Sequence, residues 1–327
     1  MTTLKDVFKN DFLVGAAVSP ASMRQHDTLI REQFNSLTAE NCMKPISVLK
    51  SLDEYSFTQA DELAAYAATN HMALRGHTLV WHNQTPDWFF RDGAGYASRE
   101  TMLRRLERHI AVMAERYAQC YAWDVVNEAV SDHPGETMRV SPWTQTVGED
   151  FVVEAFRIAA RYLPKGTLFY NDYNACLPEK RAKIIALLTR LKDTGLPVDG
   201  LGLQGHWNIA VPNMDDVGES LLQYSKLGIK LHITEMDVSV KGVMCADVTG
   251  QSHPTDEQRE RQASVWGNAF RLFREFSSSI ECVTCWGVSD DTTWLDRLHK
   301  DGFSNEPLLF DAQGRPKEAF QKVCQIN

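Results

Sequence analysis

The chain has 327 residues, 43% of them hydrophobic, and a formal net charge of −9 at pH 7. An acidic chain whose Lys and Arg residues are scattered is a poor partner for nucleic acid or for anionic lipid. No apolar run approaches the roughly 18 residues that a membrane helix needs. We therefore expect a globular protein with neither nucleic acid nor membrane as a partner.

Cysteine usage and the N-terminus bear on the cellular compartment. Seven cysteines are an odd number, which fits reduced thiols better than a disulfide framework. Residues 1–11 lack the apolar core of a secretory signal. These features favour a cytoplasmic location, unless a signal has been removed. Cys282 and Cys285 resemble a redox or zinc motif, but they fall in a strand-like run, where residues three apart point to opposite faces.

Eight apolar runs with the character of β-strands alternate with amphipathic helices. The runs are Phe12–Val18, Ser36–Glu40, Ala73–Trp81, Tyr121–Asn127, Thr167–Asn171, Val198–Gln204, Lys230–Glu235 and Glu281–Val288. Steps of three and four residues predict helices through Leu103, Leu106, Ile110, Met113 and Tyr117, and through Ile184, Leu187, Leu188 and Leu191. Capping boxes are predicted at Thr58 with Asp61 and at Thr255 with Gln258. Without repeats or linkers, residues 1–327 are expected to form a single α/β domain, a (β/α)8 TIM barrel.

Such barrels place their chemistry at the C-terminal ends of the strands. Polar and aromatic residues gather at seven successive predicted strand ends, among them Glu40, Asn41, Lys44, His77, Trp81, His82, Gln84, Asn127, Glu128, Asn171, Asp172, Tyr173, Gln204, His206, Trp207, Glu235, Asp237 and Trp286, with Trp294 in the following loop. Indole faces beside amides and carboxylates suit sugar rings, which offer apolar faces and hydroxyl rims.

Two glutamates stand out within this set. The stretch Trp123–Ala129 runs from a strand into Glu128, and Leu231–Asp237 repeats the design around Glu235, 235 − 128 = 107 residues later. One strand-end carboxylate could simply cap the next helix. Two of them are what two-carboxylate glycoside hydrolysis requires.

Two other site types fit less well. Gly200–Gly205 matches a dinucleotide-binding pattern, but it lies inside a strand-like run instead of opening a helix, so its glycines are expected to allow close packing. A metal hydrolase barrel is suggested by the histidines. His77 and His82 are five apart and would face opposite ways on one strand. No metal and no cofactor is expected, and activity that survives chelation would distinguish the two hypotheses.

Taken together, the motifs resemble glycoside hydrolase family 10, the endo-1,4-β-xylanases, from Gly15 to Phe320. The matching segments are Thr38–Asn41 with Lys44, Arg75–His82, Trp123–Ala129, Tyr170–Asn174, Gln204–His206, Ile233–Asp237 and Trp286–Asp290. The resemblance implies a (β/α)8 barrel, xylan or xylo-oligosaccharide as substrate, and retention of anomeric configuration by double displacement. It leaves the oligomeric state open.

The resemblance also implies a role for each site residue. Glu128 would be the acid/base and Glu235 the nucleophile, whose charge keeps Glu128 protonated until the glycosyl ester forms. Asn127 would bind the sugar 2-hydroxyl, and His206, oriented by Asp237, would hydrogen-bond Glu235. The remaining assignments are Gln204, Trp81 and His77 at the reacting sugar; Glu40, Asn41 and Lys44 at the next sugar on the non-reducing side; Trp286 and Trp294 as wall and roof; Gln84 and Trp294 near C5; and Asn171 with Tyr173 on the leaving-group side.

Three functional classes remain open. A retaining xylanase without a carbohydrate-binding module is favoured, and in the cytoplasm it would meet imported xylo-oligosaccharides. A barrel acting on β-1,4-glucans is the second hypothesis, which comparison of xylo- and cello-oligosaccharides would separate from the first. A sugar-binding barrel without catalysis would not need both glutamates.

Overall fold

The computed structural model describes residues 2–242, 244–245, 248–299 and 302–326. The chain divides into two compact units. Unit 1 consists of Met1–Leu37 and Leu203–Asn327, and unit 2 of Thr38–Gly202. The points of division fall within strands β2 (Ser36–Ala39) and β9 (Gly200–Leu203).

Unit 1 is built on parallel strands with helices between them. β10 pairs with β11, β11 with β12, and β12 with β1, all in parallel. The strands are β1 (Leu13–Val18), β10 (His206–Asn208), β11 (Lys230–Ser239) and β12 (Ile280–Cys285). The helices are α1 (Leu4–Val7), α2 (Pro20–Gln25), α3 (Asp27–Gln33), α10 (Met214–Ser225), α11 (Asp256–Glu275), the 3-10 turn η2 (Asp290–Thr292), α12 (Trp294–His299) and α13 (Glu318–Cys324).

Unit 2 repeats the same alternation. β3 and β4 each pair in parallel with β7, and β7 pairs in parallel with β8. Its strands are β3 (Ala73–Gly76), β4 (Val80–Trp81), β7 (Ala122–Asn127), β8 (Thr167–Asp172) and the small antiparallel hairpin of β5 (Arg91–Asp92) and β6 (Gly95–Tyr96). Its helices are α4 (Pro45–Val48), α5 (Thr58–Thr69), the 3-10 turn η1 (Asp87–Phe90), α6 (Arg99–Arg116), α7 (Pro142–Thr146), α8 (Phe151–Tyr162) and α9 (Pro178–Asp193).

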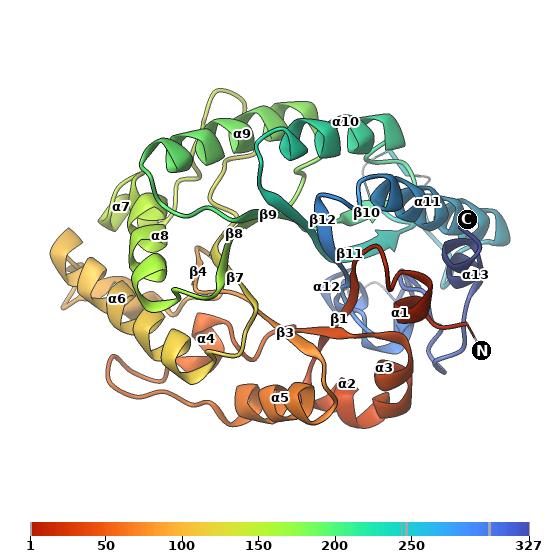
Figure 1. Cartoon of the computed structure of the whole chain (residues 1–327), viewed down its shortest axis with the longest axis horizontal. Helices are drawn as coiled ribbons and strands as arrows, with labels where there is room; N and C mark the ends of the chain where they lie inside the picture. Colours follow the sequence, from red (N-terminus) through yellow and green to blue (C-terminus); the bar gives the residue numbers. More distant parts are fainter. Residues whose placement is uncertain (1, 243, 246–247, 300–301, 327) are drawn as a thin grey trace. The chain divides into compact units, whose positions relative to one another are not determined.

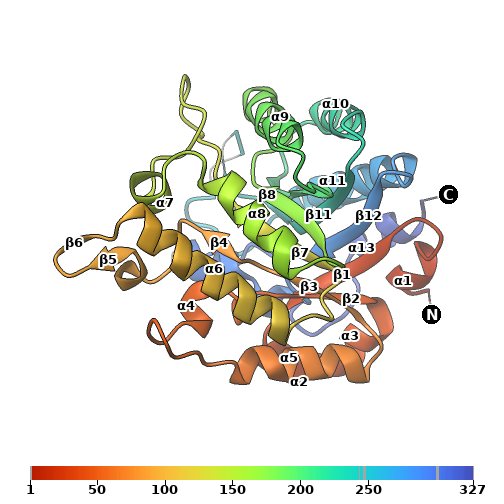
Figure 2. The same cartoon turned by 60° about the vertical axis from the view of Figure 1, so that its left-hand side comes forward.

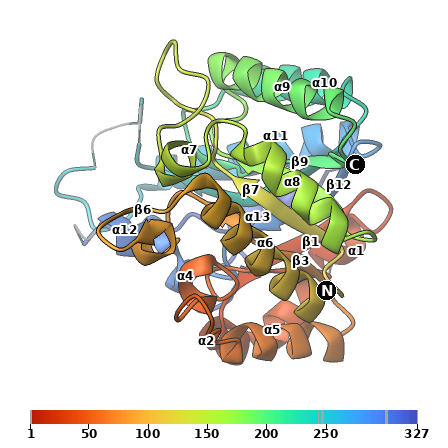
Figure 3. The same cartoon turned by 90° about the vertical axis from the view of Figure 1, so that its left-hand side faces the viewer.

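The order of strands and helices confirms the predicted (β/α)8 barrel fold, with β3 and β4 counted as one barrel strand. Within unit 2, α6 and α8 lie side by side and α8 packs on β7 and β8 (Figure 1). Figures 2 and 3 show the same helix pair from two further directions. Among the described residues, none of the helices combines the length and apolarity that crossing a membrane requires.

The predicted apolar faces are largely confirmed. In α9, Ile184, Leu187, Leu188 and Leu191 are all buried. In α6, Leu106, Ile110 and Met113 are buried, but Leu103 is only half-buried and Met102 takes the inner position in its place. A shift of one residue at the start of a helix rotates the inner face by about 100°, which the approximate spacing could not resolve.

Of the two predicted capping boxes, one is confirmed. Thr255 caps α11, its hydroxyl accepting from the N–H of Gln258 while the Gln258 side chain accepts from the N–H of Thr255. The prediction at Thr58 is wrong. Helix α5 begins at Thr58 itself and Phe57 is the capping residue, so the Thr58 hydroxyl lies inside the first turn.

The third predicted strand, Ala73–Trp81, is wrong as one continuous element. It breaks between Gly76 and Val80 because residues of this stretch bind Asp124 of β7, His77 through its side chain and Leu79 through its backbone N–H. Arg75 donates to both Asp124 carboxylate oxygens at 2.5 Å, and His77 Nδ1 lies 2.8 Å from Oδ2. The Leu79 N–H donates to the backbone carbonyl of Asp124 at 3.0 Å. The buried side chains of Arg75, His77 and Asp124 thus satisfy one another.

The last predicted strand also ends early, at Cys285 instead of Val288. Gly287 has φ = +142°, a conformation that a regular strand does not contain. The expectation that glycines in the sixth run allow close packing is confirmed, because a Cβ on Gly200 would lie 2.1 Å from the Phe169 ring.

Candidate active site

Glu128 stands at the end of β7 in unit 2. Its Oε2 accepts a hydrogen bond from Trp81 Nε1 at 2.8 Å, and its Oε1 accepts one from Asn127 Nδ2 at 3.1 Å. Asn127 Oδ1 in turn accepts from Asn171 Nδ2 at 2.8 Å. Glu128 is half-buried, while Asn127 and Asn171 are buried. The structure thus brings together four residues predicted for the site from three different strands.

The backbone of Glu128 is left-handed, with φ = +57°. A residue with a Cβ rarely adopts this conformation, and where it persists the surroundings must enforce it. The kink turns the carboxyl off the line of the strand, so that Glu128 is aimed by the chain after β7 as well as by β7 itself.

Glu235 lies within β11 in unit 1 and is 4% exposed. His206 Nε2 lies 3.2 Å from Glu235 Oε2, and His206 Nδ1 lies 2.9 Å from Asp237 Oδ2. Asp237 Oδ2 also accepts from Trp294 Nε1 at 2.8 Å. Because Glu235 and Asp237 are two apart on one strand they face the same way, and β10 places His206 beside Asp237.

The charge state of His206 follows from these contacts. Burial by itself would lower the pKa of the imidazole, but Asp237 and Glu235 outweigh it and raise the pKa of His206 to about 10. At neutral pH the ring is therefore an imidazolium that donates from both nitrogens. The ring therefore forms charge-assisted hydrogen bonds with both carboxylates.

Aromatic rings complete this part of unit 1. The His206 ring lies 5.0 Å from the Trp294 ring and 6.0 Å from the Trp286 ring, measured between centroids. The backbone N–H of Trp286 donates to the backbone carbonyl of Met236, and the backbone N–H of Glu235 donates to the backbone carbonyl of Gln204 at 2.6 Å. Five of the residues predicted from the sequence thus surround Glu235.

In unit 2 the predicted sugar-binding residues after β2 join Trp81. Lys44 Nζ donates to Asn41 Oδ1 at 2.9 Å and lies 5.0 Å from the centre of the Trp81 ring. Glu40 directly follows β2, and Gln84 follows β4 in left-handed backbone with φ = +46°. His77 reaches the same region through its ring, 6.5 Å from that of Trp81, while its Nδ1 is engaged by Asp124.

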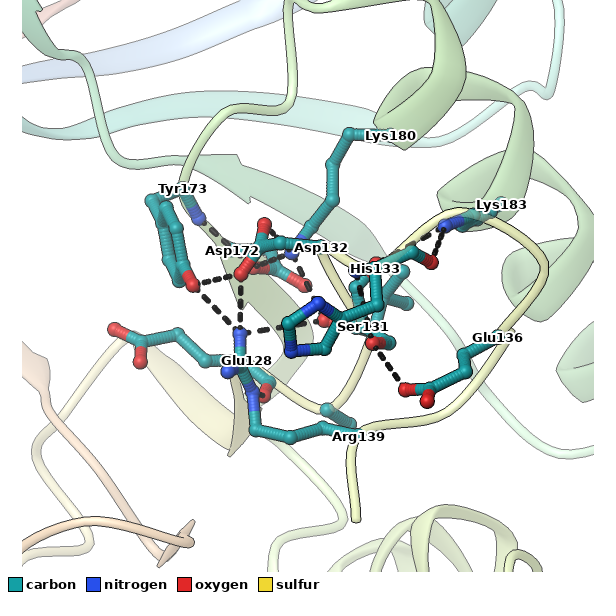
Figure 4. Close-up of polar contacts among 12 residues, drawn as sticks. Glu128, Ser131, Asp132, His133, Glu136, Arg139, Asp172, Tyr173, Lys180 and Lys183 are labelled. Atoms are coloured by element: carbon teal, nitrogen blue, oxygen red, sulfur yellow. Dashed lines mark hydrogen bonds and ion pairs between the residues drawn. The ribbon is translucent and has the colours of Figure 1, made fainter.

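A charged network follows Glu128 and was not predicted. Tyr173 Oη accepts from Arg139 at 2.6 Å and hydrogen-bonds Asp132, which also contacts Lys180 at 2.9 Å (Figure 4). Lys180 is 4% exposed. Opposite charges at positions 132 and 139 were visible in the sequence, but Lys is rarely buried, so nothing local marked Lys180.

The described residues contain no group of three or more His, Cys, Asp or Glu side chains that could hold a metal ion. Of the two histidines that suggested a metal site, His77 contacts Asp124 through Nδ1, and the His82 ring lies edge-on to the Trp81 ring with centroids 6.1 Å apart.

Comparison with known proteins identifies the family. Residues 3–326 match Glycosyl hydrolase family 10. The chain is 43% identical to an endo-1,4-beta-xylanase of Geobacillus stearothermophilus, over 99% of this chain and 98% of that protein. It is 44% identical to endo-1,4-beta-xylanase B of Paenibacillus barcinonensis, over 98% and 97%.

Solved structures agree with this assignment. The structure of xylanase XynB from Paenibacillus barcinonensis with a conduramine derivative has a TM-score of 0.96 at 43% identity, covering 100% of this chain and 99% of that one. A mutant structure in complex with xylotriose has a TM-score of 0.96 at 41% identity, covering 99% and 100%. The chain belongs to glycosyl hydrolase family 10.

Proposed function

We propose that the protein is an endo-1,4-β-xylanase that hydrolyses internal β-1,4 bonds of xylan and xylo-oligosaccharides, with the whole chain acting as one catalytic domain. Support comes from family membership and from relatives of that name at 43% and 44% identity over almost their full length. The relative solved with xylotriose favours the same substrate class.

The proposed mechanism is retaining double displacement, with Glu235 as nucleophile and Glu128 as acid/base. The observation that carries this assignment is the contrast between the two carboxylates. Glu235 is buried against the His206 imidazolium, which favours its ionised form. Glu128 is half-buried and contacts neutral N–H donors, those of Trp81 and Asn127. Carboxylates in different environments take different roles.

The reaction proceeds in two steps. Glu235 attacks the anomeric carbon while Glu128 gives its proton to the departing glycosidic oxygen, which leaves a glycosyl ester on Glu235. A water molecule then loses a proton to Glu128 and attacks the same carbon, which regenerates Glu235 and retains the configuration. Direct attack requires the two carboxyl groups to lie roughly 5–5.5 Å apart during the reaction. Asn127 binds the sugar 2-hydroxyl.

The remaining shell is proposed to bind the substrate. Trp81, His77 and Gln204 contact the reacting sugar, with Gln84 and Trp294 near its C5. The Lys44 ammonium, held by Asn41 and beside the Trp81 ring, binds hydroxyls of the next sugar together with Glu40. Trp286 forms a wall, and Asn171 and Tyr173 lie on the leaving-group side.

Digestion of xylotriose to xylohexaose, with product analysis and NMR of the anomer first formed, tests the proposal. We expect internal cleavage and a β-anomer as the first product. An α-anomer would overturn the retaining mechanism. Faster cleavage of cello-oligosaccharides than of xylo-oligosaccharides would favour the β-1,4-glucanase hypothesis instead.

A cytoplasmic location is proposed as well. All seven cysteines are free thiols, as is usual in reducing compartments. Fractionation of cells that express the natural gene tests this, and activity in the medium alone would contradict it.

A further inference from the structure

The segment Glu128–Val130 is held by an unusually complete set of hydrogen bonds. All six of its backbone N–H and C=O groups have partners, although the segment belongs to neither a helix nor a strand. The Glu128 N–H donates to the Asn171 carbonyl at 2.9 Å, and the Ala129 carbonyl accepts from the Arg139 N–H at 2.8 Å. The other four groups are bound by side chains.

Tyr170 binds two of these groups with one atom. The side chain is fully buried on β8, and its Oη accepts from the N–H of Ala129 and from that of Val130, each at 3.0 Å. A phenol has one proton and two lone pairs. Both lone pairs are used by the two N–H groups, and the proton is given to Asp172 Oδ2. Burial raises the pKa of Tyr170 well above its usual range, so the proton stays on the phenol.

Two cations bind the remaining carbonyls. Lys180 Nζ donates to the Val130 carbonyl at 2.9 Å and contacts Asp172 Oδ1 at 3.2 Å. Arg139 Nε donates to the Glu128 carbonyl at 3.1 Å. In Figure 4, Lys180 and Arg139 approach Asp132 from above and below, with Tyr173 to one side. The left-handed residue Glu128 is therefore held at both its N–H and its C=O.

We propose that Tyr170, oriented by Asp172 and assisted by Arg139 and Lys180, is a positioning residue that aims the Glu128 carboxyl at the glycosidic oxygen. The inference rests on the proposed role of Glu128 as acid/base. Tyr170 does not touch the substrate. Its hydroxyl fixes the two peptide groups that follow Glu128, and without it the left-handed turn loses two of its six restraints.

The proposal predicts a selective defect. Misplacing the acid/base should slow the departure of poor leaving groups, which need protonation, and spare good ones, which do not. Glu235 has its own contacts in unit 1, so its attack should be preserved. A hydroxyl with a merely structural role would instead lower activity on all substrates alike.

The test compares kcat/KM of Tyr170→Phe on phenyl and on dinitrophenyl β-xylobioside. We expect roughly a 10- to 100-fold loss on the phenyl substrate, part of the 10²- to 10⁴-fold that general acid catalysis supplies, and less than roughly 3-fold on the dinitrophenyl substrate. Equal losses on both would overturn the positioning role.

Tyr117→Phe is the matched control. It removes a buried phenol hydroxyl that donates to Asp61 at 3.0 Å in the same unit but has no hydrogen bond to residues 128–139. It should leave the ratio of the two substrates unchanged. If Tyr170→Phe does not fold, Arg139→Lys replaces it as the test variant. Lysine keeps the positive charge beside Asp132 but lacks the guanidinium Nε–H that donates to the Glu128 carbonyl. An unchanged substrate ratio in that variant would contradict the proposal.

Glu128→Ala in the same assay separates this inference from the proposed function. If Glu128→Ala is selective for the phenyl substrate and Tyr170→Phe is not, only the positioning role fails. If Glu128→Ala itself loses both substrates equally, the acid/base assignment fails and the inference with it.

Discussion

Glu235 lies in the middle of a ten-residue strand, whereas Glu128 follows the last residue of β7 in left-handed backbone. The first carboxylate is held by regular structure and by one partly buried cation, His206. The second is held by the segment Glu128–Val130, whose six backbone N–H and C=O groups are all hydrogen-bonded. The nucleophile must be negatively charged whenever it is not esterified. A fixed cation beside it favours that charge. The acid/base must reach a leaving oxygen and then a water molecule, and its direction matters more than its charge.

The largest expected effect concerns the nucleophile. Glu235→Ala should abolish turnover on every substrate, by more than roughly 10⁴-fold, because without the attacking carboxylate no glycosyl ester forms. Rates on dinitrophenyl and phenyl xylobiosides measure this. If Glu235→Ala kept full activity on the dinitrophenyl substrate, Glu235 would not be the nucleophile.

The acid/base should behave differently. Glu128→Ala should lose roughly 10²- to 10⁴-fold on natural substrates, yet still form the glycosyl ester from activated aryl glycosides. Added azide should then yield a β-glycosyl azide, which NMR identifies. An α-glycosyl azide would contradict retention of configuration. If no glycosyl azide forms, the variant does not form the glycosyl ester, and the acid/base assignment of Glu128 is contradicted.

The preference for xylose over glucose tests the surroundings of Glu235, where Trp294 lies. Trp294 is joined to Asp237 by a hydrogen bond and packs on His206, so its ring is fixed. Exclusion of one small group by shape is worth roughly 10–200-fold. Trp294→Ala should narrow the ratio of kcat/KM for aryl xylobioside over aryl cellobioside by a factor in that range. An equal loss on both substrates would assign Trp294 to packing alone.

The last expected effect is on stability instead of on activity. Because the folded protein raises the pKa of His206 from 6.5 to about 10, protonation of this ring stabilises the fold. The contribution is complete below pH about 6.5 and is lost as the pH rises through about 10. His206→Gln should therefore be less stable than the parent at neutral pH, by on the order of a few kcal/mol, and the difference should shrink above pH about 10. Urea unfolding at both pH values measures it, and a constant difference would mean that packing, not charge, accounts for His206.

Most of the predicted site residues lie at or near the C-terminal ends of strands, as expected. That prediction needs only the hydrophobic periodicity of the chain and the order of its strands and helices. Asn127 ends β7, Glu128 and Trp286 directly follow strands, and Asn171 lies one residue before the end of β8. The predicted strand end at Glu235 is wrong, because β11 continues to Ser239. Asp237 could be added from the two-residue step alone, since that step keeps side chains on one face.

What the amino-acid order determined by itself was the alternation of strands and helices, the capping box at Thr255 and the residue types at the strand ends. These depend on neighbours along the chain. Only the tertiary structure decided that Asp124 would bind Arg75 within β3 and His77 where the third predicted strand is interrupted. It alone decided that Tyr170 would bind the N–H groups of Ala129 and Val130, 41 and 40 residues away in sequence. A buried polar group takes whichever partner the fold brings near, and no local pattern encodes that choice.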